Sequence, residues 1–341
     1  MAEYDDLRML SDLGYDVFCP GGYADPSHPA TDMRPPLQLP YRADLDALCH
    51  AQRAKHSESD AWAIDWAKAD LHSDLIDWAD AIIVHHFPER WIAGQWPRLK
   101  GKRVIWRTCG QSNPDLERYL APLHKAGLQI VRYSPKERIA FESIHAFAGE
   151  DAMIRFGKYP ADWYGWTGED AVVGNVTQDM VGRADFCGLR FWNEATEGLP
   201  VKPAGQNSEV LGGVGSLSYD AMREYLRKIR VYLYTGTQPA SYTLGLIEAL
   251  MTGTPVVSVG PERMWMPALF EGHEIAKRWT NDPVQARTWL WELLQEPATN
   301  ESMAVRERAM DLFAIQYVGY RWQQFLGTPT PAVPQPEMAT A

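Results

Sequence analysis

The stretch from Val231 to Gly260 constrains the fold more than any other part of the chain. It opens with a run of β-branched and aromatic residues, Val231–Tyr234, which predicts a buried strand. After a turn rich in Thr, Gly and Pro, residues 241–251 place apolar side chains three and four positions apart, as one face of a helix requires. Gly253 and Pro255 end that helix, and a second apolar strand follows. Strand, helix and strand form a βαβ unit, so we expect a parallel sheet.

The start of this helix has the chemistry of an anion site. Ser241 or Thr243 can cap it, and the amides of its first turn lie at the positive end of the helix dipole. Phosphate groups bind readily at such an end. Glu248 lies about two turns further along, where a carboxylate could accept two hydrogen bonds from a diol. The alternative is that Glu248 is a solvated surface residue.

The run Gly245–Val257 (GLIEALMTGTPVV) resembles the donor-binding segment of GT-B glycosyltransferases of the retaining, GT4-like group. That family carries Glu-Pro-Phe-Gly after the strand, and then Leu-x-x-x-Glu-Ala-x-x-x-Gly-x-Pro-Val-Val. The resemblance implies that Glu248 binds the nucleotide ribose. Ala240 replaces the family's other glutamate, which contacts the donor sugar, so the identity of the sugar stays open. The phrase Tyr234–Leu244 also resembles a phage-associated branch of these enzymes.

The resemblance implies an α/β fold of the GT-B type, with two Rossmann-like domains, a cleft between them and a C-terminal helix that crosses back. We expect an acceptor-side domain at residues 1–157, a linker at 158–168, a nucleotide-sugar domain at 169–312, a crossing helix at 313–326 and a disordered tail at 327–341. The implied enzyme is a hexosyltransferase-like glycosyltransferase (EC 2.4) that moves a sugar from a nucleotide-diphosphate donor to an acceptor hydroxyl. Retention of configuration, with no metal and no cofactor, is implied as well.

The donor side is expected to comprise the helix start, a cationic group and a Gly-rich loop. Asn175 stands where the family carries an arginine, and Arg183 could supply that charge instead, with Arg190 and Lys202 as weaker candidates. In the loop Leu211–Ser216 the backbone could approach a base or a phosphate closely. The predicted donor-binding residues are Glu248, Gly236, Thr237, Ser241, Tyr242, Thr243, Asn175, Arg183, Gly213 and Val214.

Strands alternate with helices in the first half of the chain, as an α/β sheet requires. Residues 80–86, 102–108 and 129–134 read as strands, and ligands bind at the carboxyl ends of such strands. The polar residues at those ends are His85, His86, Arg107 and Ser134. The resemblance implies that one of the histidines faces the reacting sugar, although a structural histidine pair is the alternative. We therefore predict catalytic roles for both, and acceptor-side roles for Arg107 and Ser134.

Other patterns predict the remaining elements. Strands are expected at Tyr15–Cys19 and Leu199–Gly205, and a long loop at Pro20–Pro40. Helices are expected at residues 3–13, within 43–79, and at 183–195, 219–228, 283–294 and 301–325. The family opens with a strand that this chain lacks before Glu3, so we expect the reading frame to continue upstream with one.

Composition excludes several classes of protein. A hydrophobic content of 45% with 23% charged residues is typical of a soluble globular protein. There is no apolar run of the ~20 residues that a membrane helix needs, and the acidic start is no signal peptide. Four cysteines without a close pair argue against a zinc site or a disulfide framework and favour the cytoplasm. The Asp44-Leu-Asp46 triplet reads as a solvated helix face, not as a metal site.

The acceptor stays open between a glycan, a small molecule and a modified DNA base. A phage-type transferase that adds sugar to a hydroxymethylated base is one alternative function, although the net charge of −11 disfavours a nucleic-acid partner. A non-catalytic module that binds a nucleotide or a glycan is the other, motivated by Ala240 and by the missing strand. A basic groove beside the cleft would favour the first, and an absence of donor hydrolysis would favour the second.

Overall fold

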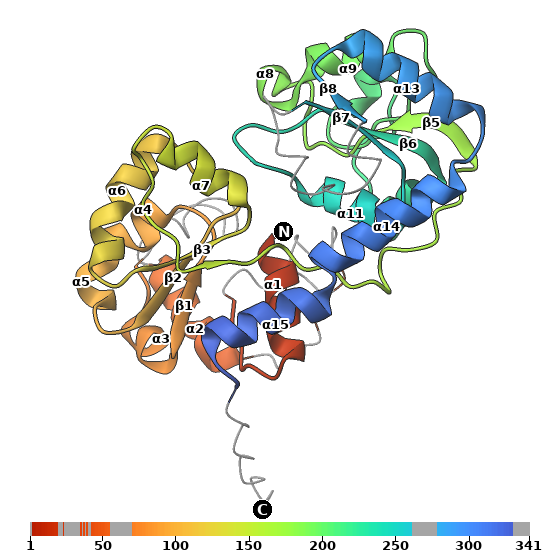
Figure 1. Ribbon diagram of the computed structural model, residues 1–341. Coiled ribbons are helices and arrows are strands. Elements are labelled where there is room, and N and C mark those ends of the chain that lie inside the picture. Colours follow the sequence, from red (N-terminus) through yellow and green to blue (C-terminus); the bar gives the residue numbers. More distant parts are fainter. Residues whose placement is uncertain are drawn as a thin grey trace, which may run out of the picture.

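The computed structural model describes residues 2–19, 42–54, 70–260 and 278–329, together with the isolated positions 23, 35, 37 and 39. These residues form two lobes, each built around a four-stranded parallel sheet (Figure 1). Most of the loop expected at residues 20–40 and most of the expected tail lie outside the described residues. None of the described helices is long and apolar enough to cross a membrane.

The first sheet has the strand order β1-β2-β3-β4 and contains the three strands that the sequence predicts. Its strands are β1 (Ala81–Val84), β2 (Arg103–Arg107), β3 (Gln129–Arg132) and β4 (Ala152–Met153). Around it lie α2 (Ala43–Ala54), α3 (Ser73–Trp78), α4 (Pro88–Trp91), η3 (Ala93–Gln95), α5 (Trp96–Leu99), α6 (Pro114–Lys125) and α7 (Pro135–Glu142). On one face, Val104 and Ile130 of the sheet pack with Leu120 of α6 in a buried apolar cluster. This alternation of strand and helix brings the carboxyl ends of the strands to one edge.

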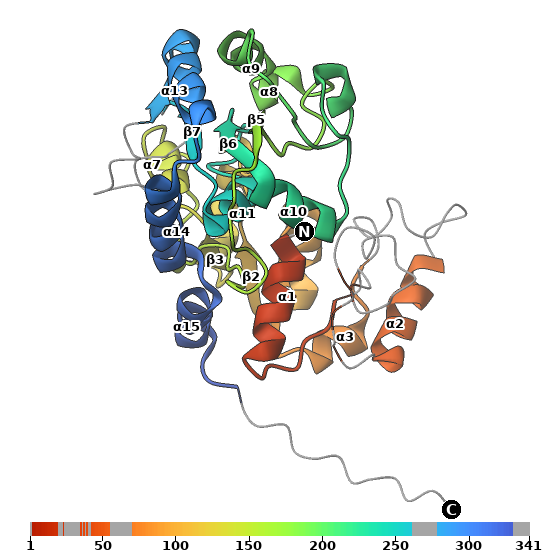
Figure 2. The ribbon, with the colours of Figure 1, turned by 90° about the vertical axis from the view of Figure 1, so that its right-hand side faces the viewer.

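Two helices from opposite ends of the chain cover the other face of this sheet (Figure 2). They are α1 (Ala2–Asp12) and α15 (Ile315–Leu326). Trp322 of α15 is fully buried against Ile105 and Val131 of the sheet and Met9 of α1. The preceding helix, α14 (Thr299–Phe313), packs instead on the second lobe. The C-terminal helices therefore cross back from one lobe to the other, as expected.

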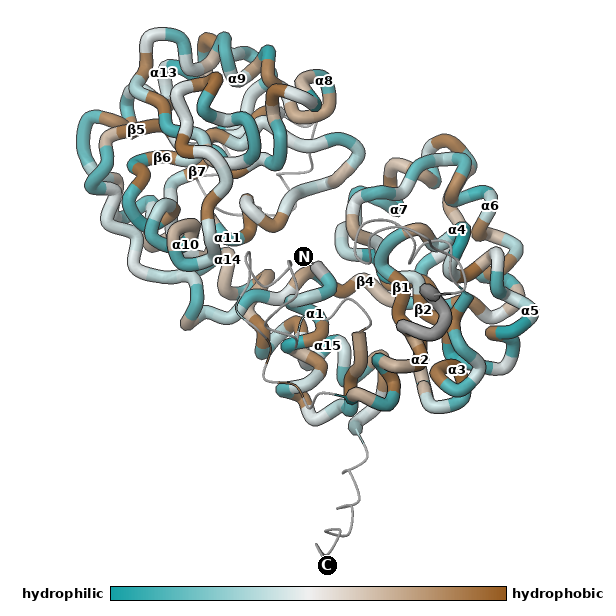
Figure 3. The backbone as a smooth tube through the Cα atoms, turned by 180° about the vertical axis from the view of Figure 1, so that it is seen from behind, coloured by the Kyte–Doolittle hydropathy of each residue, from teal (hydrophilic) through white to brown (hydrophobic). Residues whose placement is uncertain are grey.

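The second sheet has the order β5-β6-β7-β8 and contains the predicted βαβ unit. Its strands are β5 (Asp170–Gly174), β6 (Ile229–Tyr234), β7 (Val256–Val259) and β8 (Trp279–Thr280). Its helices are α8 (Ala184–Cys187), α9 (Leu189–Thr196), η4 (Ser208–Leu211), α10 (Tyr219–Lys228), α11 (Leu244–Thr252) and α13 (Pro283–Gln295). Every residue of β6 and β7 is buried, which explains why all of them except Arg230 and Ser258 are apolar or aromatic. Figure 3 shows the two lobes from behind.

Two predicted strands are corrected. Residues 15–19 are extended but pair with no strand among the described residues; Tyr15 and Val17 are apolar because they pack beside α15. Residues 199–205 make only single bridges to the β5 segment, at Val201 and Ala204. Prolines at positions 200 and 203 lack the N–H that a continuous ladder needs.

Two predicted helices are each divided in two. The helix expected at 183–195 is broken at Gly188, whose φ of 71° is left-handed. The helix expected at 301–325 is broken at Ala314, where Lys158 inserts. The Lys158 amide donates to the Phe313 carbonyl at 2.7 Å, and its carbonyl accepts from the Ile315 amide at 3.0 Å. The segment that joins the lobes is thereby attached to the point where the C-terminal helices cross.

Candidate functional site

The loops after β2 and β3 meet the loop before α11 between the two lobes. The Ser241 amide donates to the Tyr133 hydroxyl at 2.6 Å, and the Tyr242 hydroxyl donates to the Tyr133 carbonyl at 2.5 Å. A Cβ placed on Gly110 would lie 2.7 Å from the Cβ of Ala240. These contacts bring the predicted donor loop directly against the first lobe.

The helix of the βαβ unit begins at Leu244 and not at Ser241. Thr243 is its cap, since its hydroxyl accepts from the Leu246 amide at 3.4 Å. Ser241 is buried and its amide already has Tyr133 as partner, so it does not cap the helix. Gly236, with φ 78°, and the half-buried Thr237 lie in the turn before it. The amides of the first turn, from Leu244 onward, therefore remain the candidate phosphate site.

Glu248 belongs to a buried ionic triad. Its Oε1 lies 2.7 Å from the Nζ of Lys158, which lies 2.7 Å from the Oδ2 of Asp5 on α1. Lys158 is 1% exposed and Glu248 3%. The alternative reading of Glu248 as a solvated surface residue is thereby excluded. Its carboxylate is committed to holding α1, the connecting segment and α11 together.

His85 and Arg107 share one buried carboxylate. The Nε2 of His85 lies 3.0 Å from the Oδ2 of Asp6, and the Nε of Arg107 lies 3.2 Å from the same oxygen. Arg107 is fully buried and also donates to the Ile154 carbonyl at 2.5 Å. The expectation that Arg107 faces an acceptor is corrected, because its guanidinium anchors α1 and the end of the first sheet.

His86 is held between an acid and a thiol. Its Nε2 lies 2.8 Å from the Oε1 of Glu3, and its Nδ1 lies 3.0 Å from the Oε1 of Gln111 and 3.4 Å from the Sγ of Cys109. The hydrogen bond with Cys109, followed by that with Glu3, raises the pKa of His86 to about 11 although burial opposes it. An imidazolium that keeps its proton throughout the neutral range can donate but cannot act as a general base.

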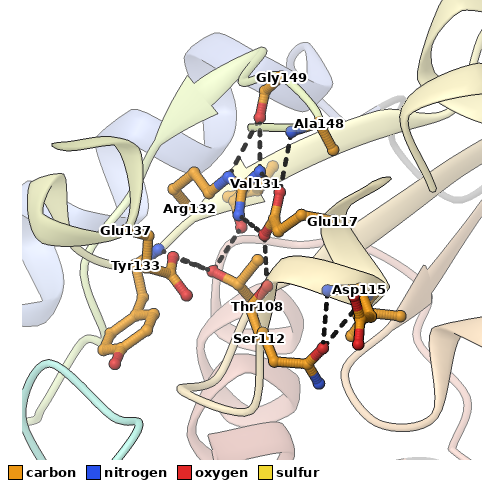
Figure 4. A network of polar contacts seen from close by, with 12 residues as sticks. Thr108, Ser112, Asp115, Glu117, Val131, Arg132, Tyr133, Glu137, Ala148 and Gly149 are labelled. Atoms are coloured by element: carbon orange, nitrogen blue, oxygen red, sulfur yellow. Dashed lines mark hydrogen bonds and ion pairs between the residues drawn. The ribbon is translucent and has the colours of Figure 1, made fainter. Parts of the chain in front are cut away.

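A second buried network holds the loop after β2 in place (Figure 4). Arg132 and Glu117, both inaccessible to solvent, form a bidentate pair at 2.5 and 2.7 Å. Glu117 also accepts from the Ser112 hydroxyl and from the Ala148 amide. Such paired, fully satisfied charges define the geometry of their surroundings closely. The loop carrying Cys109 is therefore presented on a rigid support.

A cavity of about 570 Å³ opens at the carboxyl ends of β1 and β2. His85 and Cys109 line it, and so do aromatic and polar side chains from α4, α6 and the loop between β2 and α6. The described residues that line it are His85, Phe87, Pro88, Glu89, Trp106, Cys109, Gln111, Ser112, Asn113, Asp115, Leu116 and Tyr119. Its volume is within the range of ligand sites.

Ser134 and Asn175, both predicted as site residues, have structural roles. Ser134 is buried and caps α7, accepting from the Lys136 amide at 3.2 Å. Asn175 is buried and its Nδ2 donates to the Leu233 carbonyl at 2.7 Å, which ties β5 to β6. Both side chains are buried within the protein. The prediction that they contact a ligand is therefore corrected.

The remaining donor candidates are also engaged. Arg183 folds back onto the Gln178 carbonyl, although its side chain is exposed. The amides of Gly213 and Val214 donate to the carbonyls of Ser208 and Pro203, at 2.9 Å each. The backbone amides of that Gly-rich loop thus stabilise its own fold, and the close approach of its backbone to a base or a phosphate stays a prediction.

Sequence reasoning missed the residues that organise this site. Lys158, Asp6, Glu3, Cys109 and Tyr133 were not singled out. The one signal available was the acidic start of the chain, whose carboxylates all belong to the first two turns of α1. Spacing alone could not indicate which cations they would meet.

No family model matches the sequence, and no curated protein matches it significantly. Solved structures do resemble the fold. Sucrose-phosphate synthase from Thermosynechococcus elongatus is 13% identical with a TM-score of 0.59, over 86% of this chain and 80% of that one. HepE of Anabaena in complex with UDP and glucose is 12% identical with a TM-score of 0.58, over 79% and 84%.

TarM is 10% identical with a TM-score of 0.52 over 72% of this chain, which spans about half of TarM (54%). Identities this low establish the architecture alone. The chain therefore has the GT-B fold of these glycosyltransferases, with two Rossmann-like domains, a cleft between them and a C-terminal helix that crosses back.

Proposed function

We propose that this protein is a glycosyltransferase that moves a sugar from a nucleoside-diphosphate donor to an acceptor hydroxyl. The observation that carries the proposal is the position of α11. Thr243 caps its first turn, and Glu248 is linked through Lys158 to Asp5 of the first lobe. Solved structures of the similarly folded HepE contain UDP or UDP-glucose. A UDP-sugar is therefore the first donor to test.

In this proposal the first turn of α11 holds the diphosphate, where its amides and the helix dipole would stabilise the charge of the leaving group. The ribose hydroxyls would compete with Lys158 for the carboxylate of Glu248. Lys158 would then be a cation close to the nucleotide. It would join Arg183 as a candidate to balance the negative charge of the diphosphate. Binding the nucleotide and holding the lobes together would thus involve the same buried charges.

We further propose that transfer retains the anomeric configuration and needs no bound metal. The support is the likeness of Gly245–Val257 to the retaining group. Proton NMR of the sugar released or transferred from an α-linked UDP-sugar tests this directly. An α-configured first product is expected, and a β-configured first product would contradict retention.

Donor use can be measured without knowing the acceptor. Purified protein is incubated with UDP-glucose, UDP-N-acetylglucosamine, ADP-glucose and GDP-glucose, and the nucleoside diphosphate released is quantified. Thermal shift with UDP, ADP and GDP reports binding separately. Release from at least one donor, together with stabilisation by its nucleotide, is expected. A failure of all four nucleotide sugars to bind or react would refute the proposal.

A non-catalytic nucleotide-binding module is the second candidate. One observation favours it: Ala240 has no carboxylate to offer the donor sugar. The same experiment separates the two functions. Nucleotide stabilisation without any donor hydrolysis or transfer would assign the module and exclude the enzyme.

A further inference from the structure

The cavity at the ends of β1 and β2 has the dimensions and the walls of a binding site for a small polar molecule. Its volume is about 570 Å³. Trp106 forms part of its wall and is 2% exposed, whereas Phe87 and Tyr119 are 52% and 56% exposed. Large apolar rings that remain half in solvent beside a cavity provide faces on which a flat or ring-shaped ligand can pack.

The polar groups around these rings include both hydrogen-bond donors and acceptors, which can bind the hydroxyl groups of a ligand. The side-chain oxygens of Gln111 and Asn113 are already occupied, the first by His86 and the second by the amides of Asp115 and Leu116. The amide nitrogens of both side chains therefore remain as donors. The carboxylates of Glu89 and Asp115 are acceptors on the same wall. A hydroxyl can serve both kinds of group, because it donates one hydrogen bond and accepts two.

The carboxylates of the cavity wall disfavour phosphate, while the His86 imidazolium contacts Gln111 and Cys109 of the same wall. Among the described residues that line it there is no lysine or arginine, but there are two carboxylates. The amino end of α6 would ordinarily attract an anion, but Asn113 caps it, with its Oδ1 3.1 and 3.0 Å from the amides of Asp115 and Leu116. Asp115 adds a negative charge at that end, and the nearby Arg118 pairs with it at 3.1 Å.

The cavity is adjacent to the place where a donor sugar would be delivered. Cys109, in its wall, precedes Gly110, and Gly110 contacts Ala240 in the loop before α11. Ala240 occupies the position whose family counterpart contacts the donor sugar. The wall of the cavity is therefore next in sequence to the residue that packs against the loop before α11.

We propose that this cavity binds an uncharged, polyhydroxylated acceptor, the terminal sugars of a neutral glycan. The assignment rests on the proposed glycosyltransferase function and extends it to the class of acceptor. The rings contact the apolar faces of the sugar, while the two amides and the two carboxylates bind its hydroxyls. A nucleic acid or a phosphorylated sugar meets the carboxylates and is rejected.

Saturation-transfer NMR titrations with defined probes test the assignment. The neutral probes are maltose, cellobiose, lactose and N,N′-diacetylchitobiose. The charged probes are maltose 6′-phosphate and a single-stranded oligonucleotide containing 5-hydroxymethylcytosine. At least one neutral disaccharide should bind with a Kd on the order of 1 mM, as expected for a single shallow sugar site, and more tightly than either charged probe.

Substitutions identify the cavity as the place of binding. Tyr119→Ala should weaken the neutral probe about fivefold, as the loss of one stacking ring predicts. Tyr320→Ala, which removes a ring of similar exposure on α15, should leave binding unchanged. The double variant Glu89→Gln/Asp115→Asn should reduce the discrimination against the phosphorylated disaccharide.

Three results would overturn the proposal: no neutral probe binds, a charged probe binds as tightly, or Tyr119→Ala behaves like Tyr320→Ala. Titration of UDP, ADP and GDP in the same samples keeps the two proposals distinct. Binding of a nucleotide without any neutral sugar defeats the acceptor assignment alone. Binding of a neutral sugar in the cavity without any of the three nucleotides defeats the transferase and leaves a glycan-binding site.

Discussion

Glu248→Gln tests the buried triad, because it keeps the shape of the side chain and removes its charge. In the native protein the Nζ of Lys158 lies 2.7 Å from Glu248 and 2.7 Å from Asp5. The side chains of Lys158 and Glu248 are 1% and 4% exposed. The substitution leaves a buried ammonium with one carboxylate instead of two.

The expected cost follows from what remains around Lys158. Removing one partner of an isolated buried ion pair costs about 3–5 kcal/mol. Here Asp5 still neutralises Lys158, and the amide oxygen of glutamine can still accept a hydrogen bond. We therefore expect a loss of about 2–3 kcal/mol, within the range of a hydrogen bond to a charged group. The sequence-based expectation of unchanged folding considered only helix propensity and is replaced.

Urea unfolding measures this loss. With a slope of about 3 kcal/mol/M, the midpoint should fall by about 0.8 M. Glu307→Gln on α14 is the matched control, since Glu307 is exposed and should change stability by less than about 0.5 kcal/mol. If Glu248→Gln unfolds at the same midpoint as this control, the triad contributes no stability and the reasoning is wrong.

Nucleotide affinity is then measured without urea, at a temperature at which the native protein and the variant are both folded. If Glu248 binds the ribose, Glu248→Gln should weaken UDP about tenfold or more, and a 2′,3′-dideoxy analogue much less. Equal weakening of both ligands would show that Glu248 acts on the nucleotide only through the structure. No weakening of either ligand would remove the ribose role.

Three further predictions concern the cleft and a buried acid. Saturating UDP should reduce the radius of gyration in solution scattering if the lobes close on the donor, and an unchanged value would count against closure though not against binding. Gly110→Ala should destabilise the protein by about 1–3 kcal/mol, because its φ is 85° and the new Cβ would meet Ala240 at 2.7 Å. Gly127→Ala, with φ 109° and open space, is the control that carries the backbone cost alone, so equal losses of thermal stability would refute the contact. Burial raises the pKa of Glu137 from 4.5 to about 7, so the native state binds its proton more tightly than the unfolded chain. Stability should therefore fall by about 3 kcal/mol between pH 4.5 and 7, and Glu137→Gln should flatten that slope in urea titrations, whereas an unchanged slope would contradict the assignment.

Local patterns were sufficient for much of the fold. The strands at the ends of the βαβ unit are apolar because both faces are covered, and this composition is visible without any knowledge of their partners. The helix Tyr219–Lys228 was predicted with its observed bounds, because Ser218 caps it and its apolar face is clear. Residues 15–19 were wrongly predicted as a strand. Their apolar side chains pack against the core, but their backbone pairs with no described strand, and a packed extended segment has the same local sequence pattern as a buried strand.

The side-chain contacts within the site could not be predicted from local patterns. Position in a βαβ unit was enough to predict α11, although it begins at Leu244 and not at Ser241, and to single out Glu248, but not the partner of Glu248. Lys158 is 90 residues away from Glu248 in sequence and 153 from Asp5. Similarly, Arg107 and Ser134 lie at the expected strand ends, yet their side chains turn into the protein. Secondary structure depends on neighbours along the chain, which the sequence displays. Ion pairing and burial depend on which distant segments meet, and only the packing of the two lobes decides that.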